Sequence, residues 1–230
     1  MSVAVVTGGS RGIGAATARR LAADGWDVAI GYRRDHDAAA TVVADLEAAG
    51  RRAVAVAGDL SAREPVVALF AAAAGLGPIG ALVNNVGVVD VAARVDELDE
   101  ARLHRMFTTN LVGPFLCAGE AVRRMSTRHG GTGGVIVNVS SSAAKTGGAG
   151  QYVDYAASKA GIDLLTVGLA KEVVGEGIRV NTVRPGVTRT DIHASGGQPD
   201  RAERLGPQIP MGRAGEPEEI AAAIAWFCSP

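Results

Sequence analysis

The fold is decided by residues 3–14, which read VAVVTGGSRGIG. The apolar run at the start predicts a buried strand, glycines follow it at once, and a helical pattern begins among the glycines. This order can place a phosphate against backbone N–H groups at the start of a helix, and glycine allows that close approach because it has no Cβ. The stretch alone leaves one alternative open, a tight strand-to-helix turn without a ligand.

Strands and helices continue to alternate along the chain. Strands are predicted over 3–7, 27–32, 52–59, 81–85, 134–140 and 178–183, and helices over 12–23, 36–49, 63–74, 99–129, 153–175 and 216–228. Strict alternation requires crossover connections and therefore a parallel sheet with helices on both faces. No composition shift divides the chain, so residues 1–230 are predicted to form a single doubly wound α/β domain. The polar segment 188–213, rich in glycine and proline, is predicted to be a substrate-binding loop or lid within it.

The composition limits which partners are expected. The 230 residues are 47% hydrophobic and carry a net charge of −1 with both signs mixed, so no electrostatic argument favours nucleic acid or a membrane surface. No apolar run approaches the ~18 residues of a membrane span, and no basic leader precedes the first strand. Two cysteines, Cys117 and Cys228, and the lack of a His/Cys cluster predict a cytoplasmic protein with no metal site.

The end of the second predicted strand reads YRRD (32–35). An acid at such a strand tip would accept hydrogen bonds from a ribose 2′-OH, whereas an arginine suits a 2′-phosphate. Here Arg33 and Arg34 follow the tip, and the planar fork of Arg11 in the glycine loop could reach the same phosphate. A solvated basic turn is the alternative. Asp59, after the third strand, either bonds an adenine amino group or caps the following turn.

The stretch YAASK (155–159) places a tyrosine and a lysine four residues apart, on one face of a predicted helix. A phenol has an ordinary pKa of ~10 and is a poor acid or base near neutrality, and a nearby ammonium group lowers that pKa. Tyr155 and Lys159 are therefore predicted to serve proton transfer to or from an oxygen atom. Asp154 is predicted to cap the helix N-terminus, which leaves Tyr152 just outside the helix.

Two further polar features lie near predicted strand ends or within a helix. The run Ser140, Ser141 and Ser142 follows the fifth strand, at the edge where parallel sheets bind ligands. A serine there can hydrogen-bond a carbonyl oxygen, although serine runs are also ordinary in turns. Asn110 lies in the middle of a predicted helix, where asparagine is mildly disfavoured. It is expected either to kink the helix through a local hydrogen bond or to bind a water molecule in the site.

These residues together resemble the short-chain dehydrogenase/reductase family over nearly the whole chain. Within the family, the sequence is similar to bacterial 3-oxoacyl-acyl-carrier-protein reductases and glucose 1-dehydrogenase-like oxidoreductases. The motifs that carry the resemblance are TGGSRGIG (7–14), NNVG (84–87), YAASK (155–159) and RPGVTRTD (184–191). The second of these has Val86 where the family motif has alanine.

The resemblance implies a Rossmann-type sheet in the strand order 3-2-1-4-5-6, with the family's seventh strand missing from this chain. The catalytic residues that it implies are Asn110, Ser141, Tyr155 and Lys159. The cofactor-binding residues that it implies are Gly8, Arg11, Gly12, Ile13, Gly14, Arg33, Asp59, Leu60, Asn85, Gly87, Tyr155, Lys159, Pro185, Gly186 and Thr188. Ser142 is the reserve for Ser141, because Ser142 has the family's 13-residue spacing to the tyrosine, whereas Ser141 matches when the sequences are aligned from the strand.

The implied activity is that of an NADP-dependent oxidoreductase, with NADP(H) preferred over NAD(H) because of the position of Arg33. It would interconvert a ketone and a secondary alcohol. Tyr155 would be the acid/base, Lys159 would lower its pKa and hold the nicotinamide ribose, Ser141 would orient the carbonyl group, and Asn110 would bind a proton-relaying water. The family also implies a homotetramer or homodimer.

Two alternatives to this activity are weighed. An enoyl-type reductase would use Tyr152, which precedes Lys159 by seven residues, as related enoyl reductases do. A non-catalytic NADP-binding regulator on the same scaffold is the other alternative, although such proteins typically lose the tyrosine or the lysine, and both are present here.

Overall fold

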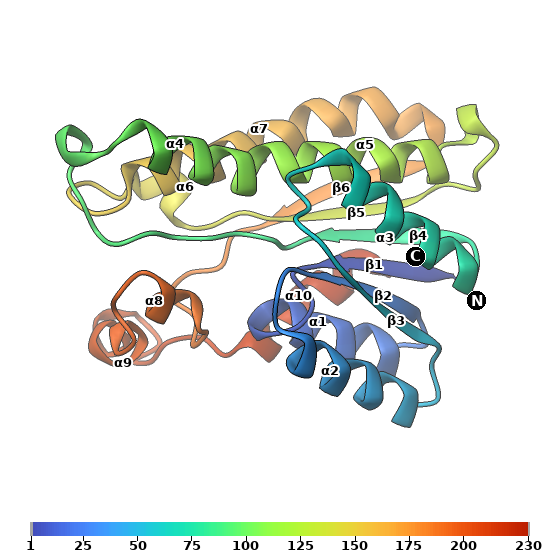
Figure 1. Cartoon of the computed structure of the whole chain (residues 1–230), viewed down its shortest axis with the longest axis horizontal. Helices are drawn as coiled ribbons and strands as arrows, with labels where there is room; N and C mark the ends of the chain where they lie inside the picture. Colours follow the sequence, from blue (N-terminus) through green and yellow to red (C-terminus); the bar gives the residue numbers. More distant parts are fainter. Residues whose placement is uncertain (1, 230) are drawn as a thin grey trace.

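The computed structural model describes residues 2–229 and contains one parallel sheet in the strand order β3-β2-β1-β4-β5-β6 over those residues (Figure 1). Its strands are β1 Val3–Thr7, β2 Asp27–Tyr32, β3 Ala53–Ala57, β4 Ile79–Asn84, β5 Gly134–Val139 and β6 Ile178–Val183. The predicted α/β class, the parallel pairing and the strand order are thereby confirmed. The order reverses between β1 and β4, which is the point where sheets of this kind open to a ligand.

Helices cover both faces of the sheet. In Figure 1, α1, α2 and α10 lie below it, and α3, α5 and α7 lie above it. The long helices are α1 Gly12–Ala23, α2 His36–Ala48, α3 Arg63–Leu76, α4 Glu100–Phe107, α5 Gly113–Met125, α7 Val153–Val173 and α10 Pro217–Cys228. None of the described helices is both long and apolar enough to span a membrane.

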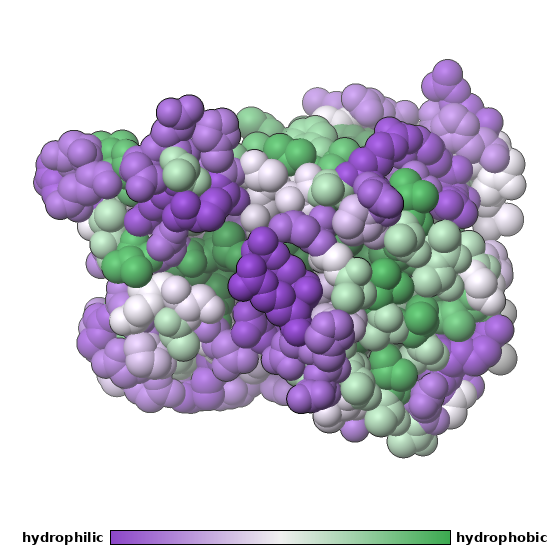
Figure 2. All heavy atoms as spheres, viewed as in Figure 1, coloured by the Kyte–Doolittle hydropathy of each residue, from purple (hydrophilic) through white to green (hydrophobic). Residues whose placement is uncertain are grey.

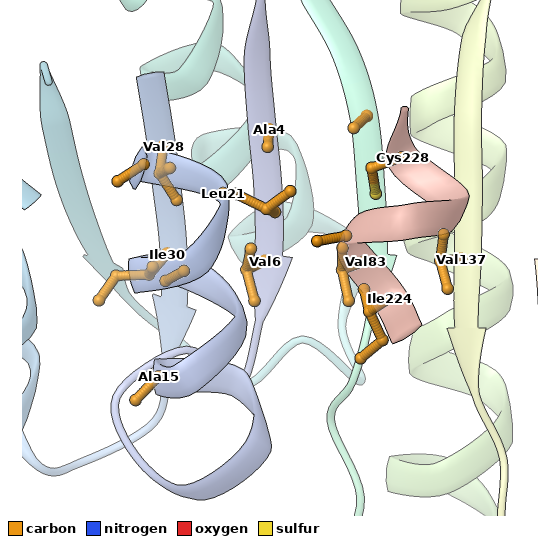
Figure 3. Close-up of a cluster of buried hydrophobic side chains, with 14 of the residues drawn as sticks. Ala4, Val6, Ala15, Leu21, Val28, Ile30, Val83, Val137, Ile224 and Cys228 are labelled. Carbon is orange, nitrogen blue, oxygen red and sulfur yellow. The ribbon is translucent and has the colours of Figure 1, made fainter. Parts of the chain in front are cut away.

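The central strand β1 shows why its sequence is apolar throughout. All five of its residues are buried, and successive side chains enter opposite cores. Val6 packs with Leu21 of α1 and Ile224 of α10 on one face (Figure 3), and Val5 packs with Phe70 of α3 on the other. A strand covered on both faces is buried on both, so it reads as a continuous Val/Ala run rather than an alternating one. The two cores fix the carboxyl ends of the strands as a rigid edge.

The predicted helix over 99–129 is wrong as a single element. Helix α4 ends at Phe107, a turn of π-helix (η2) occupies Thr108–Val112, and α5 then runs from Gly113 to Met125. Asn110 lies in the middle of the π turn. A π turn holds one more residue than an α turn, and such turns occur often at functional sites.

The predicted N-cap of the helix over 153–175 is also wrong. Helix α7 starts at Val153, and Tyr152 occupies the cap position without a side-chain cap bond. Asp154 lies inside the first turn, where it is buried and accepts hydrogen bonds from Arg102 of α4. The Asp154 carboxylate therefore bonds to Arg102, 52 residues away in sequence, and not to the backbone N–H groups at the start of α7.

The segment 188–213 projects beside the sheet edge as a lobe at the lower left of Figure 1. We refer to it as the lid. It contains only short helices, α8 Ile192–Ser195, α9 Arg201–Leu205 and the 3-10 turn η5 Gly206–Gln208. A bridge between Thr188 and Gly215 closes its base. Such a long segment with little regular structure, set beside a strand edge, has the character of a binding loop.

Candidate active site

A cleft of about 870 Å³ opens at the carboxyl ends of the strands, between the sheet edge and the lid. In Figure 2 the molecule is hollowed between the lid at lower left and the lobe above it, and apolar residues show in the recess. The volume lies within the range of small-molecule and cofactor sites. Polar side chains line it along the turn after β1, at the ends of β2 and β3, between the end of β5 and the start of α7, and on the lid.

The turn between β1 and α1 is folded too tightly for side chains. Gly8 and Gly12 have φ angles of +64° and +52°, which favour glycine. A Cβ on Gly14 would lie 2.1 Å from the Gly8 carbonyl oxygen. Helix α1 begins at Gly12, and the side chain of its cap residue Arg11 makes no hydrogen bond to the first turn. The backbone N–H groups of this helix start are therefore suited to bind a phosphate, and the turn fits the pyrophosphate of a dinucleotide.

Asparagine braces this glycine turn from the neighbouring strand. The side-chain amide of Asn85, just after β4, donates to the carbonyl oxygens of Thr7 at 3.0 Å and Gly8 at 3.2 Å. The backbone N–H of Asn85 donates to the Thr7 hydroxyl at 2.9 Å. Two residues further on, Gly87 leaves room for the lysine of the YAASK motif, since a Cβ there would lie 3.1 Å from Lys159 Nζ. The NNVG motif thus holds the glycine turn and makes space in the cleft.

Arginines gather where β2 and β3 end. Arg33 pairs with Asp59 at 3.0 Å, and Arg11 and Arg34 line the same end of the cleft. Asp59 also accepts from the backbone N–H and hydroxyl of Ser61, at 3.1 and 2.6 Å. The Ser61 hydroxyl is the largest cause that holds the Asp59 pKa below its ordinary value. Asp59 thus caps the following turn and pairs with Arg33, and its contact with an adenine amino group stays a prediction.

Ser141, Tyr155 and Lys159 meet at the ends of β5 and α7. Lys159 Nζ donates to the Val139 carbonyl oxygen at 2.8 Å and lies 5.9 Å from the centre of the Tyr155 ring. A hydrogen bond joins the side chains of Ser141 and Tyr155. Ser142 instead begins the short helix α6 Ala143–Thr146, and its N–H donates to Pro185. Of the two candidate serines, Ser141 is the one that the structure brings to Tyr155.

Burial dominates the protonation of this group. It raises the pKa of the Tyr155 phenol, and the hydrogen bond with Ser141 only opposes that rise. Burial also lowers the pKa of Lys159 to about 8, against a smaller opposite effect of Asp163. The lowered phenol pKa expected from the lysine is therefore not what this structure shows. Burial disfavours the charged form of both groups, the phenolate of Tyr155 and the ammonium of Lys159.

Asn110 holds the loop after β4 rather than pointing into open cleft. Its side-chain oxygen accepts from the Val88 N–H at 2.8 Å, and its amide donates to the Val88 carbonyl oxygen at 2.9 Å. The amide is also within 3.2 Å of the Ser158 hydroxyl. The expected local kink is present as the π turn. The Asn110 side chain itself bonds to the backbone of Val88.

Most of the residues implied by the family motifs line the one cleft. Those that do are Gly8, Arg11, Gly12, Ile13, Arg33, Asp59, Leu60, Asn85, Gly87, Ser141, Tyr155, Lys159, Pro185, Gly186 and Thr188. Gly14 and Asn110 do not line it. Gly14 leaves room for the backbone of the glycine turn, and Asn110 holds the backbone of Val88, which does line the cleft. No group of three or more His, Cys, Asp or Glu side chains among residues 2–229 could hold a metal ion.

Sequence reasoning missed the ion pair beside Tyr155. Arg102 donates to Asp154 through two nitrogens, at 2.8 and 3.3 Å, and to the Val91 carbonyl oxygen at 2.6 Å. The side chains are 9% and 0% exposed. The pair joins α4, the loop after β4 and the first turn of α7. No local signal could have revealed it, because its three parts are distant in the sequence.

A doubly wound sheet with a glycine turn at its switch point, and a tyrosine–lysine pair in the same cleft, is typical of dinucleotide-binding oxidoreductases. The profile of the short chain dehydrogenase family matches residues 2–200. The chain therefore belongs to the short-chain dehydrogenase family, whose members bind a nicotinamide cofactor. It is an oxidoreductase that acts on CH–OH or C=O groups.

Relatives of known sequence and structure span the whole chain. The uncharacterized oxidoreductase YgfF of Escherichia coli K12 is 50% identical over 230 residues, covering 100% of this chain and 93% of that protein. The 3beta-hydroxysteroid dehydrogenase 1 of Eggerthella lenta is 41% identical, covering 98% of this chain and 85% of that protein. A short chain dehydrogenase from Burkholderia cenocepacia J2315, solved in complex with NADP, has a TM-score of 0.89 and 35% identity, covering 100% of this chain and 91% of that one.

Proposed function

We propose that the protein is an NADP(H)-dependent oxidoreductase that interconverts a ketone and a secondary alcohol, with Tyr155 as the acid/base. The observation that carries this proposal is the convergence of Ser141, Tyr155 and Lys159 in the same cleft as the glycine turn. The glycine turn, which would bind the cofactor phosphates, and Tyr155, which would transfer the proton, line the same cleft. The name of the steroid dehydrogenase relative indicates that a hydroxyl-bearing carbon is the kind of centre on which such a site acts.

Each residue of the group has a role that its contacts support. The bound nicotinamide would supply the acceptor or donor of the hydride. The Ser141 hydroxyl would bond the substrate oxygen, and Tyr155, to which Ser141 is hydrogen-bonded, would pass a proton to or from that oxygen. Lys159 is anchored on Val139 through one of its three donors, which leaves two for the hydroxyls of the cofactor ribose. Asn110 would keep the Val88 backbone in place and hold any relaying water through it.

The preference for NADP(H) over NAD(H) is supported by the arginines at the ends of β2 and β1. Arg11, Arg33 and Arg34 all line that end of the cleft. Guanidinium groups pair with a phosphate through two parallel hydrogen bonds, and the strand tip offers no acid to receive a ribose 2′-OH. The ion pair with Asp59 pre-positions Arg33 there.

The protein is further proposed to work in the cytoplasm as a homodimer or homotetramer, with segment 188–213 as its substrate lid. Both cysteines are buried free thiols, which suits a reducing compartment. An apolar groove runs along α5 and α7, and Phe115 and Leu164 are exposed on it. Exposed apolar patches of this kind commonly mark protein interfaces.

The test of the proposed reaction is the substitution Tyr155→Phe, with Tyr152→Phe as the matched control. Tyr155→Phe removes one hydroxyl and is expected to reduce NADPH-dependent ketone reduction at least ~10³-fold, which is within what acid/base catalysis contributes. Binding of NADPH, followed by its fluorescence, should stay within about threefold. Tyr152→Phe removes only the acceptor of a bond from the lid residue Gln198 and should retain most turnover.

Three other results would each contradict a part of the proposal. Retained turnover in Tyr155→Phe would remove Tyr155 from its role. Loss confined to Tyr152→Phe, with an α,β-unsaturated substrate, would favour the enoyl-type reaction. Tight NADPH binding without turnover of any ketone or alcohol would favour a cofactor-binding regulator.

A further inference from the structure

Two arginines of the lid converge without an acidic partner. Arg201 Nη1 and Arg204 Nη2 both donate to the side-chain oxygen of Gln198, at 2.9 and 2.6 Å. Within residues 2–229 neither guanidinium forms an ion pair, although Arg189 and Arg213 of the same segment each pair with glutamates. Two like charges drawn to one amide oxygen repel each other, so the arrangement favours a negative charge from outside the chain.

Arg201 is the member of this pair that lines the cleft. Its guanidinium carbon lies 5.2 Å from the centre of the Tyr152 ring, and its Nη1 also donates to the Gln151 side-chain oxygen at 3.0 Å. The Tyr152 hydroxyl accepts from Gln198 Nε2 at 2.8 Å. The guanidinium is thus fixed over an aromatic face, and its Nη1 donates to two amide oxygens. Its Nε and Nη2 make no hydrogen bond within the described part of the chain.

Arg201 forms no ion pair within residues 2–229, although one carboxylate of the same segment, Asp191, also lines the cleft. His193, which also lines this end, has Nε2 at 2.9 Å from the Thr188 carbonyl oxygen, so that nitrogen carries the proton. Burial lowers the His193 pKa, which leaves the ring neutral near pH 7. Glu203, the nearest glutamate in sequence, is paired with Arg189. The lid therefore contributes to the cleft one positioned guanidinium that has no ion-pair partner among the described residues.

The position of the Arg201 guanidinium relative to Tyr155 indicates the class of substrate. Tyr152, under the guanidinium, precedes Tyr155 by three residues at the start of α7, about one turn or ~5 Å along the helix. Resting on the function proposed above, we infer that Arg201 binds a carboxylate of the substrate, and that the substrates are keto and hydroxy acids whose carboxylate lies several bonds from the reacting carbon. The unbonded Nε and Nη2 of this guanidinium can donate two parallel hydrogen bonds to the two oxygens of a carboxylate.

The first experiment measures binding without turnover. The complex of the protein with NADP⁺ is titrated with benzoate and with benzamide, two rigid probes of the same shape that differ in charge. Benzoate is expected to bind about ten to a hundred times more tightly, as for one charge-assisted pair. Arg201→Gln should abolish that difference. Arg204→Gln is the matched control, because Arg204 shares Gln198 but does not line the cleft, and it should keep most of the difference.

The second experiment measures specificity during turnover. Secondary alcohols are offered in pairs, as the carboxylate and as its methyl ester, with NADP⁺. The parent protein should prefer the acid in kcat/KM by at least about tenfold. Arg201→Gln should lose this preference through KM of the acid, with turnover of the ester little changed. Arg201→Lys should restore part of it, since the charge returns without the planar fork.

The outcomes separate this inference from the proposed reaction. Equal binding of benzoate and benzamide, or equal losses for acid and ester in Arg201→Gln, would overturn the inference and leave Arg201 as a clasp between the lid and α7. Tighter binding of phenyl phosphate than of benzoate would overturn the choice of a carboxylate. Benzoate selectivity without turnover of any alcohol would support the anion site and contradict the proposed reaction.

Discussion

At the scale of single residues, Lys159 is an amine held in a buried site. It is buried beneath Tyr155, and its pKa of about 8 lies below the ordinary value of 10.5. Between these pH values the unfolded chain keeps a proton that the folded chain has released. The contribution of Lys159 to stability therefore rises with pH across this window, by at most about 1.4 kcal/mol per pH unit.

This linkage predicts the behaviour of Lys159→Met. The stability of the parent protein relative to the variant, measured by urea unfolding, is expected to increase from pH 8 to pH 10.5 and to be flat below pH 7. Lys171→Met removes an exposed lysine of the same helix and reports any general effect of losing one positive charge. A difference between parent and Lys159→Met that does not change with pH would contradict the buried, partly discharged amine.

A second residue-scale prediction concerns Arg33. Arg33→Gln is expected to weaken NADPH binding about tenfold, at the low end for charge-assisted hydrogen bonds because the side chain is 58% exposed. NADH binding should stay within about twofold, since NADH has no 2′-phosphate. Both constants come from fluorescence titrations of the same preparation, so NADH is the internal control. An equal fall for both cofactors would show that Arg33 supports the fold of the turn and does not select the cofactor.

The residues that could be predicted are those whose role follows from local spacing. The glycines after β1 and the Tyr155–Lys159 pair occur within one turn each, and the structure places them in one cleft. The residues that were missed act through distant partners. Asp154 bonds to Arg102, and Gln198 bonds to Tyr152, 46 residues away. A single sequence does not show which distant side chains meet, so these contacts required the fold.

At the scale of elements, the buried ion pair between Arg102 of α4 and Asp154 of α7 is expected to hold the start of α7 in place. Asp154→Asn keeps the shape and removes the charge, which leaves the Arg102 guanidinium buried without compensation. The free energy of unfolding is expected to fall by about 3–5 kcal/mol, as for other broken buried pairs. Chemical denaturation with one readout of secondary structure measures it.

The matched control for that prediction is Asp45→Asn. Asp45 pairs with Arg19 between α2 and α1 at 2.8 Å, and both side chains are nearly half exposed. Exposed pairs contribute about 0.2–1 kcal/mol, so this variant should lose no more than that. Equal losses in the two variants would show that the buried pair is not what fixes the start of α7.

All six strands and five of the six predicted helices lie within two residues of their predicted bounds, and the one exception has a physical reason. The strands are buried on both faces, so their Val/Ile/Ala runs mark them directly; β1 was predicted over 3–7 and is Val3–Thr7. The prediction of one helix over 99–129 failed because α4 and α5 carry continuous helical patterns, and the π turn between them depends on Asn110 meeting Val88. Helix boundaries set by tertiary contacts leave little trace in local periodicity.

At the scale of the whole molecule, the groove along α5 and α7 predicts self-association. Phe115 and Leu164 are 51% and 72% exposed there. Light scattering coupled to gel filtration is expected to give the mass of a dimer or tetramer. Leu164→Glu should reduce that mass to a monomer, because it places a charge in the middle of an apolar contact.

Val95→Glu is the control for the groove. Val95 is 66% exposed but lies in the 3-10 turn η1 Val95–Glu97, outside the residues that line the groove. It should leave the mass unchanged. A parent protein that is already monomeric, or a Leu164→Glu variant with the parent's mass, would show that the groove is not an interface.

The π turn at 108–112 has a consequence for how this molecule can vary. One additional residue rotates everything that follows by about 100° around the helix axis. Helix α4 is thereby aimed at Asp154, while α5 is aimed at the sheet. Deleting a single residue from the turn would restore an unbroken spiral and bring the wrong side of α5 onto the core. The turn therefore sets the rotation of α5 relative to α4, so that each helix presents the correct side to its own neighbour. It should tolerate substitutions far better than an insertion or a deletion.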